Sequence, residues 1–168
     1  VLGKYLDDRF LIEEKLGEGG MSTVWRVRDV VGGKTLAVKI LRSNTADPSM
    51  RERFLQEAET QAKLQSPHVA RLYHFGRDMT LGHLFTVMEL VEGDDLAWLV
   101  EHGKIPLDLS LMIIDQTLAG LAHTHSQGVI HRDIKPSNIK LAIRDGGLCV
   151  KLLDFGYVRL KKTERHLT

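Results

Sequence analysis

The segment His131-Arg132-Asp133-Ile134-Lys135-Pro136-Ser137-Asn138 carries more chemical information than any other part of this sequence. It brings a carboxylate, two cations, an imidazole and an amide together, and the apolar residues Ile130 and Ile139 flank it. Further along, the predicted strand Val150 to Leu153 ends in Asp154-Phe155-Gly156. The pattern predicts a polar loop followed by a strand, and a loop of this polarity is either a functional site or a plain surface turn.

Three side chains of these two segments suit phosphate chemistry. Asn138 and Asp154 offer the side-chain oxygens that Mg²⁺ prefers. Asp133 lies five residues before Asn138 and can accept a proton from a hydroxyl group while metal ions neutralise phosphate charge. The two segments therefore favour phosphoryl transfer.

A single cation, Lys39, lies in the apolar stretch Leu36-Ala37-Val38-Lys39-Ile40-Leu41. A lysine in a half-buried strand is often an ordinary surface residue that extends its ammonium group into water. A functional lysine needs an anionic partner, and the next predicted helix offers Glu57 close to its apolar side, whereas Glu52 and Glu59 are placed as solvated charges. From these residues alone, a Lys39–Glu57 pair and a surface lysine remain equal alternatives.

The glycine cluster Gly17-Glu18-Gly19-Gly20 follows a predicted strand. Without Cβ atoms, such a loop can bring backbone N–H groups close to phosphate oxygens, but a glycine-rich turn explains the pattern equally well. A dinucleotide-binding fingerprint needs a helix after the glycines, and residues 23–29 instead alternate as a strand does. A Walker-type loop needs Gly-Lys-Ser/Thr, which is absent from the sequence.

Periodicity and turn residues predict an α+β fold. The first half reads as strands at 10–16, 23–29, 35–41, 70–75 and 84–90, with one helix from Pro48 to about Leu64. We assign the buried face of this helix to Leu55, Ala58 and Ala62. The second half reads as helices at 96–102 and 107–127 and strands at 139–143 and 148–153. In the long helix, Leu111, Ile114, Leu118 and Leu121 recur at three- and four-residue steps.

Composition narrows the class of protein. Over 168 residues, 43% are hydrophobic, 27% are charged and the net charge is +1, which is typical of a soluble globular protein without a strong field for nucleic acid or anionic membranes. No apolar run reaches the length of a membrane helix. Cys149 is the only cysteine, so no internal disulfide can form, and we expect a reducing, cytoplasmic location.

Taken together and in order, these motifs resemble the eukaryotic-like (Hanks-type) protein kinase family. The resemblance covers almost the whole chain: the glycine loop with Val24, Lys39, Glu57, the segment from His131 to Asn138, and Asp154-Phe155-Gly156. Two motifs look most like those of the bacterial serine/threonine branch, namely Gly-Glu-Gly-Gly-Met-Ser and Lys-Pro-Ser-Asn. The resemblance implies a two-lobe kinase fold, with a five-stranded antiparallel sheet and one helix at residues 1–91 and a truncated, mainly helical lobe at residues 92–168.

The resemblance also implies a role for individual residues. Asp133 is expected to be the catalytic base, with Lys135 near the γ-phosphate and Lys39, oriented by Glu57, on the α and β phosphates. Asn138 and Asp154 are the expected magnesium ligands. The nucleotide-binding residues implied in this way are Leu16, Gly17, Glu18, Gly19, Gly20, Val24, Ala37, Lys39, Met88, Glu89, Val91, Asp95 and Lys140.

The implied function is transfer of the γ-phosphate of ATP, with Mg²⁺, to serine or threonine hydroxyls of proteins. The resemblance also implies self-association of the protein for autophosphorylation. We expect neither a nucleic-acid partner nor a membrane segment in this span. The second reading is a non-catalytic, ATP-binding pseudokinase, which the intact Lys39, Asp133, Asn138 and Asp154 disfavour. Lys135-Pro136-Ser137 disfavours a small-molecule kinase.

Two positions depart from the family pattern. Lys140 stands where the family usually has an apolar floor for adenine, and Gln61 stands one turn after Glu57 where an apolar residue that stacks toward Phe155 is usual. No Ala-Pro-Glu-like motif follows Gly156. We therefore expect an incomplete catalytic domain, cut in the activation segment, that exposes an apolar patch beneath its long helix and has little activity by itself.

Overall fold

The chain forms two compact units. The computed structural model describes residues 2–19, 22–41, 48–79, 82–153 and, for the backbone alone, 159–160. The first unit comprises Val1–Ala62 and Ala70–Leu90, and the second comprises Lys63–Val69 and Val91–Thr168. The sequence predicted two lobes, at residues 1–91 and 92–168. The main difference is that the short segment Lys63–Val69 groups with the second unit.

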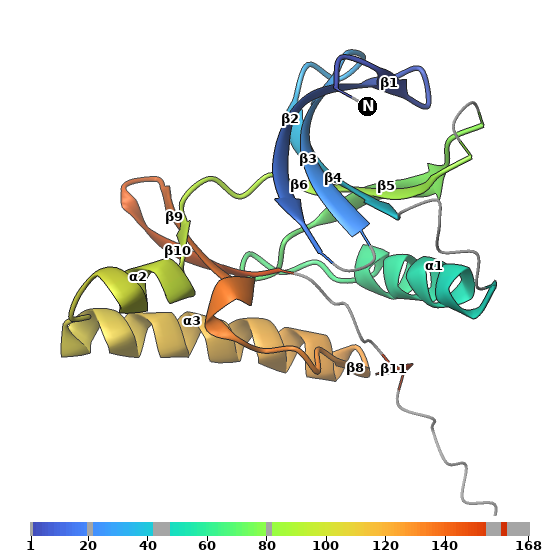
Figure 1. The fold of residues 1–168 in the computed structure, drawn as a ribbon. Helices are drawn as coiled ribbons and strands as arrows, with labels where there is room; N and C mark the ends of the chain where they lie inside the picture. The colour runs from blue at the N-terminus through green and yellow to red at the C-terminus, as the bar shows by residue number, and fades with distance from the viewer. Residues whose placement is uncertain (1, 20–21, 42–47, 80–81, 154–158, 161–168) are drawn as a thin grey trace, which may run out of the picture. The chain divides into compact units, whose positions relative to one another are not determined.

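A curled antiparallel sheet forms most of the first unit (Figure 1). Its strands lie in the order β1-β2-β3-β4-β6-β5, and within the described residues there are six of them, rather than the five predicted. The bounds are β1 (Tyr5–Leu6), β2 (Phe10–Glu18), β3 (Ser22–Asp29), β4 (Thr35–Leu41), β5 (Leu72–Arg77) and β6 (Leu84–Glu89). The additional strand, β1, has only two residues, too few to show an alternating pattern in the sequence.

One face of this sheet carries the core of the first unit. Its buried members alternate along the strands, as period two requires, and are Leu6, Phe10, Ile12, Val27, Leu36, Val38, Ile40, Phe85 and Val87. Helix α1 (Pro48–Ala62) packs against β5 (Figure 1). Its buried face contains Phe54, Ala58 and Gln61, whereas Ala62 is exposed, so our assignment of that face was one step out of phase.

An ion pair between the exposed Arg9 and the buried Asp29 fixes the β1–β2 turn to the β3–β4 hairpin. The Asp29 carboxylate accepts hydrogen bonds from Arg9 Nε at 2.8 Å and Nη2 at 2.7 Å, and from the Val31 amide at 3.1 Å. Asp29 is buried, and the Arg9 guanidinium is the largest of the causes that hold the pKa of its carboxyl well below the ordinary value of 3.8. Because this pKa is lowered on folding, the stabilisation is present above the ordinary value and is lost as the pH falls through the folded-state pKa.

We expect Asp29→Ala to lower the free energy of unfolding of the first unit by about 3 kcal/mol at neutral pH, because it leaves several donors unpaired. The sequence has two tryptophans, and Trp25 packs on the core of this unit, so a Trp98→Phe background isolates its fluorescence in a urea titration. Glu52→Ala, which removes an exposed acid from α1, is the matched control and should have little effect. An equal loss in both variants, or an Asp29→Ala effect that does not shrink as the pH falls from the ordinary value toward the folded-state pKa, would contradict the role of the ion pair.

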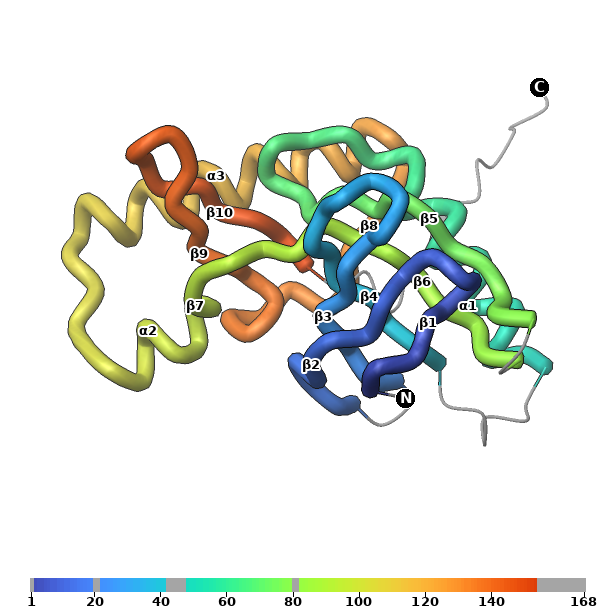
Figure 2. The backbone as a smooth tube through the Cα atoms, turned by 90° about the horizontal axis from the view of Figure 1, so that it is seen from above, coloured from blue at the N-terminus to red at the C-terminus, as the bar shows by residue number. Residues whose placement is uncertain are grey.

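The second unit combines two helices with short strands. Helix α2 (Leu96–His102) and helix α3 (Leu107–Ser126) cover one face of a sheet ordered β10-β9-β7. These strands are β7 (Asp94–Asp95), β9 (Ile139–Arg144) and β10 (Gly147–Leu152). A two-stranded sheet pairs β8 (Val129–Ile130) with β11 (Arg159–Leu160), and a 3₁₀ turn, η1, spans Pro136–Asn138. Figure 2 shows β7 beside β9 in this unit.

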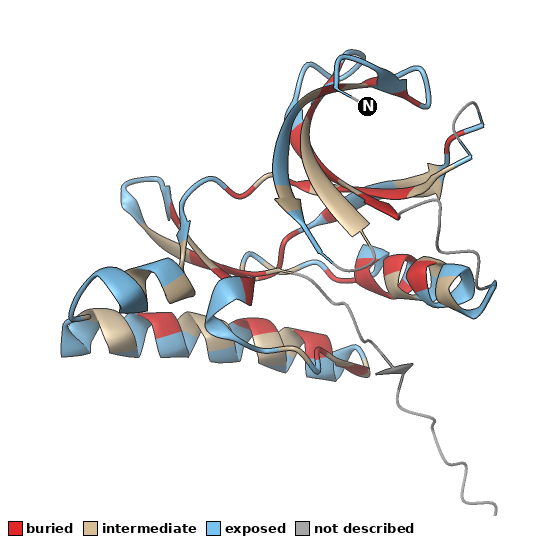
Figure 3. Cartoon of the chain, in the orientation of Figure 1, coloured by how far each residue is buried: buried red, intermediate tan, exposed pale blue. Residues whose placement is uncertain are grey.

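The long helix α3 presents a different face to the core from the one its sequence suggests. Leu111, Ile114 and Leu118 are exposed, at 57%, 53% and 58%, and of the four residues only Leu121 packs against the core cluster. Figure 3 shows buried, intermediate and exposed positions along this helix. The buried positions are instead Ile113, Gly120 and Thr124. The expectation of an exposed apolar patch beneath this helix is thus confirmed for the described residues.

The segment Lys63–Val69 joins the second unit through backbone contacts. The Leu152 amide donates to the His68 carbonyl at 2.9 Å, and the Gln65 amide donates to His123 Nε2 on α3 at 3.1 Å. Gly120 lets α3 approach this closely, because a Cβ there would be 2.9 Å from the His68 carbonyl oxygen. None of the helices that the structure describes combines the length and apolar character needed to cross a membrane.

Candidate active site

Four of the predicted nucleotide-binding residues share one face of the first sheet. Pairing aligns Val24 with Lys39 across β3 and β4, and Ala37 with Met88 across β4 and β6. Directly paired residues lie on the same face, and this face is opposite the one that carries Val27, Val38 and Val87 of the core. Strand alternation thus gathers Val24, Ala37, Lys39 and Met88 on a common surface.

The glycine cluster continues strand β2 instead of forming a separate loop. Gly17 pairs with Val24, and the Gly19 amide donates to the Ser22 carbonyl at 2.9 Å, while Gly20 lies outside the described residues. Nothing lies within 4 Å of a Cβ built at Gly17, and neither Gly17 nor Gly19 has a positive φ. The described fold does not itself require glycine at Gly17, so the open space beside the backbone suits the close approach of a ligand.

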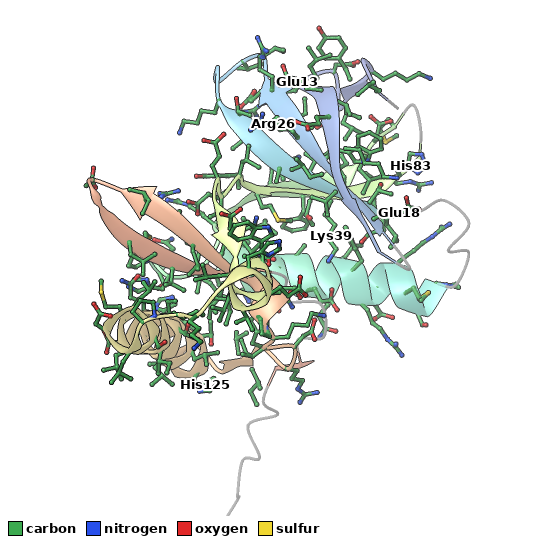
Figure 4. The ribbon with its side chains drawn as sticks, turned by 60° about the vertical axis from the view of Figure 1, so that its left-hand side comes forward. Glu13, Glu18, Arg26, Lys39, His83 and His125 are labelled. Carbon is green, nitrogen blue, oxygen red and sulfur yellow. The ribbon has the colours of Figure 1, made fainter. Side chains whose placement is uncertain are left out.

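Lys39 and Glu57 are both half-buried in the first unit, whereas Glu52 and Glu59 are exposed. This burial agrees with the expected distinction between Glu57 and the solvated acids of α1. In Figure 4 the labelled Lys39 lies where the sheet approaches α1. The Lys39–Glu57 pair itself stays a prediction. Leu16 and Glu18, also predicted to bind nucleotide, are exposed near the end of β2.

In the second unit, Asp133, Lys135 and Asn138 form a hydrogen-bonded cluster. Lys135 Nζ lies 2.9 Å from Asp133 Oδ2, and Asn138 Nδ2 donates to the same oxygen at 2.9 Å and to the Asp133 carbonyl at 2.8 Å. The 3₁₀ turn that begins at Pro136 brings Asn138 back over Asp133. Residues that the sequence spreads over six positions therefore meet at a single carboxylate.

The environment keeps Asp133 ionised. The hydrogen bond from Lys135 is the largest of the causes that lower the pKa of the Asp133 carboxyl, and the Asn138 amide and the charge of Lys135 act in the same direction. Burial opposes them. A carboxylate of lowered pKa is a weak base, so its contribution is to orient a hydroxyl group and to accept its proton late in the reaction.

The donor set around Asn138 fits a hard cation. Both hydrogen bonds of the Asn138 side chain to Asp133 use its nitrogen, so its amide oxygen is the atom oriented to accept a cation. Asp154, the second predicted ligand, lies outside the described residues. The residue before it in the chain, Leu153, donates its amide proton to the Asn138 carbonyl at 2.8 Å.

His131 links the two motifs, a role that the sequence did not reveal. It is buried, its Nδ1 accepts from the Asp133 amide at 3.3 Å, and its Nε2 donates to the Leu153 carbonyl at 2.8 Å. These two bonds require the neutral tautomer with the proton on Nε2. The position of His131 between the apolar Ile130 and the acid Asp133 was the signal in the sequence that could have suggested a bridging histidine.

Arg132 has a left-handed backbone, with φ of 63°, and an exposed side chain. Such a conformation in a residue other than glycine costs about 1 kcal/mol or more and persists where the surroundings impose it. Its two neighbours along the chain are both fixed, His131 by burial and Asp133 by its hydrogen bond to His131. The strain therefore belongs to the same loop as the carboxylate.

Three more of the predicted nucleotide-binding residues are Glu89, Val91 and Asp95. They lie in the stretch from the last residue of β6 to the residue before α2. The Glu89 carboxylate accepts from the Arg71 amide at 3.1 Å, so its side chain serves the first unit, and Val91 is buried. The Asp95 carboxylate accepts from the Trp98 amide at 2.9 Å as the N-cap of α2. Asp95 therefore has a structural role in addition to its predicted contact with the nucleotide.

The two departures from the family pattern both have polar partners. Lys140 Nζ donates to the Gly93 carbonyl at 2.7 Å. Gln61 is buried in α1, and its Nε2 donates to the Ala70 carbonyl at 3.3 Å, which satisfies a polar group at a position where we had expected a weakness. Phe155, the expected stacking partner, lies outside the described residues.

Comparisons with known proteins find similar sequences and a similar structure. Residues 10–168 match the family model of the protein kinase domain. The chain is 40% identical over 156 residues to the serine/threonine-protein kinase PknL of Mycobacterium tuberculosis, covering 92% of this chain and 38% of that protein. For the kinase pkn2 of Myxococcus xanthus the identity is 38%, over 92% of this chain and 19% of that protein. The crystal structure of the Mycobacterium tuberculosis PknI kinase domain superposes with a TM-score of 0.77 at 28% identity, covering 93% of this chain and 62% of that one. The chain thus spans less than two thirds of each of these relatives.

Proposed function

The chain belongs to the protein kinase family, and on that premise we propose that the protein carrying it is an ATP-dependent serine/threonine kinase. The observation that supports this most strongly is the cluster in which Lys135 and Asn138 both contact the Asp133 carboxylate. The bacterial relatives named above, each called a serine/threonine-protein kinase, support the same reaction.

The proposed step is an in-line displacement at the γ-phosphorus of ATP. The Asp133 carboxylate orients a serine or threonine hydroxyl and takes its proton as the oxygen–phosphorus bond forms, and ADP leaves with the electron pair of the broken bond. Lys135 and Lys39 offset negative charge on the phosphoryl groups, with Glu57 proposed to orient Lys39. Mg²⁺, when bound through Asn138 and Asp154, supplies further charge neutralisation.

The other predicted contacts remain part of the proposal. Val24, Ala37 and Met88 share a sheet face that suits an adenine ring, and the open backbone at Gly17 suits phosphate oxygens. Protein substrates, self-association for autophosphorylation and a cytoplasmic location are proposed on the same family grounds. A non-catalytic, ATP-binding regulator is the second candidate, and no described residue favours it specifically.

The proposal is tested by incubating the full-length protein with Mg²⁺, γ-labelled ATP and a generic protein substrate. We expect label on serine and threonine after acid hydrolysis, and its loss when EDTA removes the metal ion. Label found on tyrosine alone would contradict the serine/threonine assignment. Absence of transfer, with ATP binding retained, would favour the regulator.

A further inference from the structure

The chain passes between the two units at Ala62–Lys63, at Val69–Ala70 and at Leu90–Val91. Hydrogen bonds hold both sides of the last of these crossings. On the first unit, the Glu89 amide donates to the Arg71 carbonyl at 2.8 Å, and the Glu89 carboxylate accepts from the Arg71 amide. The last residue of β6 is thereby fixed to its own unit.

On the second unit, the chain is fixed again from Gly93 onward. Asp94 and Asp95 pair with Leu141 and Lys140 of β9 (Figure 2). Gly93 has φ of 135°, and a Cβ there would be 2.1 Å from the Leu141 carbonyl oxygen, so the backbone lies directly against β9. The crossing itself is therefore reduced to Leu90, Val91 and Glu92.

Lys140 supplies the side-chain bond at the start of this fixed stretch. Its own cross-strand partner is Asp95, yet its ammonium reaches along β7 to the Gly93 carbonyl at 2.7 Å. β7 is an edge strand of only two residues, so few ladder bonds hold it in place. A charged donor to a carbonyl is one of the stronger hydrogen bonds available there.

We propose that Lys140 is a positioning residue that clamps the Gly93 carbonyl and so fixes the second-unit end of the crossing between the units. This role deepens the proposed function and rests on it in one respect: Val91 and Asp95, on either side of the clamp, are proposed nucleotide contacts. Lys140 acts on the nucleotide through the Gly93–Asp95 backbone, in place of the direct contact that the family resemblance implied for it.

The test compares Lys140→Met with Lys140→Arg in the full-length protein, and Lys104→Met, which removes an exposed lysine from the same unit, is the control. Hydrogen–deuterium exchange of the amides of residues 93–95 should become about tenfold faster in Lys140→Met, because the clamp bond is lost, and should be restored by arginine, which can still donate. The KM for ATP should rise about fivefold, with kcat changed less than about twofold.

Unchanged exchange in Lys140→Met would overturn the clamp. Faster exchange with an unchanged KM would overturn its role in nucleotide binding, and a fall in KM would show that an apolar side chain serves the nucleotide directly. The exchange measurement needs no activity, so a wild-type protein that transfers no phosphate would refute the proposed function while leaving the clamp to be judged by exchange alone.

Discussion

Asp133→Asn in the full-length protein is expected to reduce phosphoryl transfer about 1,000-fold while ATP binding stays within about twofold of wild type. The amide keeps the shape of the side chain and one oxygen to accept from Asn138, but it cannot accept a proton from a substrate hydroxyl. It also loses the charge that holds Lys135 at 2.9 Å. Transfer of labelled phosphate and an equilibrium titration with ATP measure the two quantities separately.

A matched control is Asp115→Asn, which makes the same chemical change at an exposed position of α3. It should leave both quantities unchanged. If Asp133→Asn alters neither transfer nor binding, Asp133 is not the base and the regulator becomes the better description. If ATP binding falls together with transfer, the substitution has disturbed the loop instead of removing a single chemical step.

Gly93→Ala is expected to lower the free energy of unfolding of the second unit by about 4 kcal/mol. The new Cβ would meet the Leu141 carbonyl oxygen at 2.1 Å, a backbone atom that cannot move without disturbing the β7–β9 pairing, and φ of 135° is unfavourable for alanine in any surroundings. Trp98 of α2 lies beyond β7 and stacks on His102 at 4.3 Å, so its fluorescence in a Trp25→Phe background reports this unit.

The control for Gly93→Ala is Gly146→Ala in the turn between β9 and β10. Gly146 also has a positive φ, of 77°, but nothing lies within 4 Å of a Cβ built there. Its substitution should cost about 1 kcal/mol, the conformational penalty alone. Similar losses at the two glycines would mean that the close approach of Gly93 to β9 contributes nothing to stability.

The exposed face of α3 shows where sequence periodicity was ambiguous. Leucines and isoleucines occupy several sides of this helix, so the three- and four-residue steps of Leu111, Ile114 and Leu118 were a valid but not a unique stripe. The choice of face was made by the close approach of the segment Lys63–Val69 to Gly120, a contact between residues far apart in the sequence. Periodicity gives a helix its apolar sides but not the side that its own unit covers.

Local chemistry, in contrast, was readable directly. The order of Lys39, Glu57, Asp133, Asn138 and Asp154 indicated phosphoryl transfer. The family resemblance implied nucleotide contacts at Val24, Ala37 and Met88, and strand pairing places these three residues on one face. Turn residues also located the hairpins, because Gly33 and Gly82 adopt the positive φ that their turns need. These features depend on neighbours along the chain or on directly paired strands.

The sequence by itself therefore determined the family, the chemistry and the phase of most strands, since each follows from residue type and short-range spacing. Only the tertiary structure decided that His131 joins Asp133 to Leu153, that Lys140 holds the Gly93 carbonyl, and that Lys63–Val69 belongs with the second unit. The physical reason is that these are single polar contacts between distant segments. A hydrogen bond across 22 or 47 residues leaves no periodic trace in the sequence.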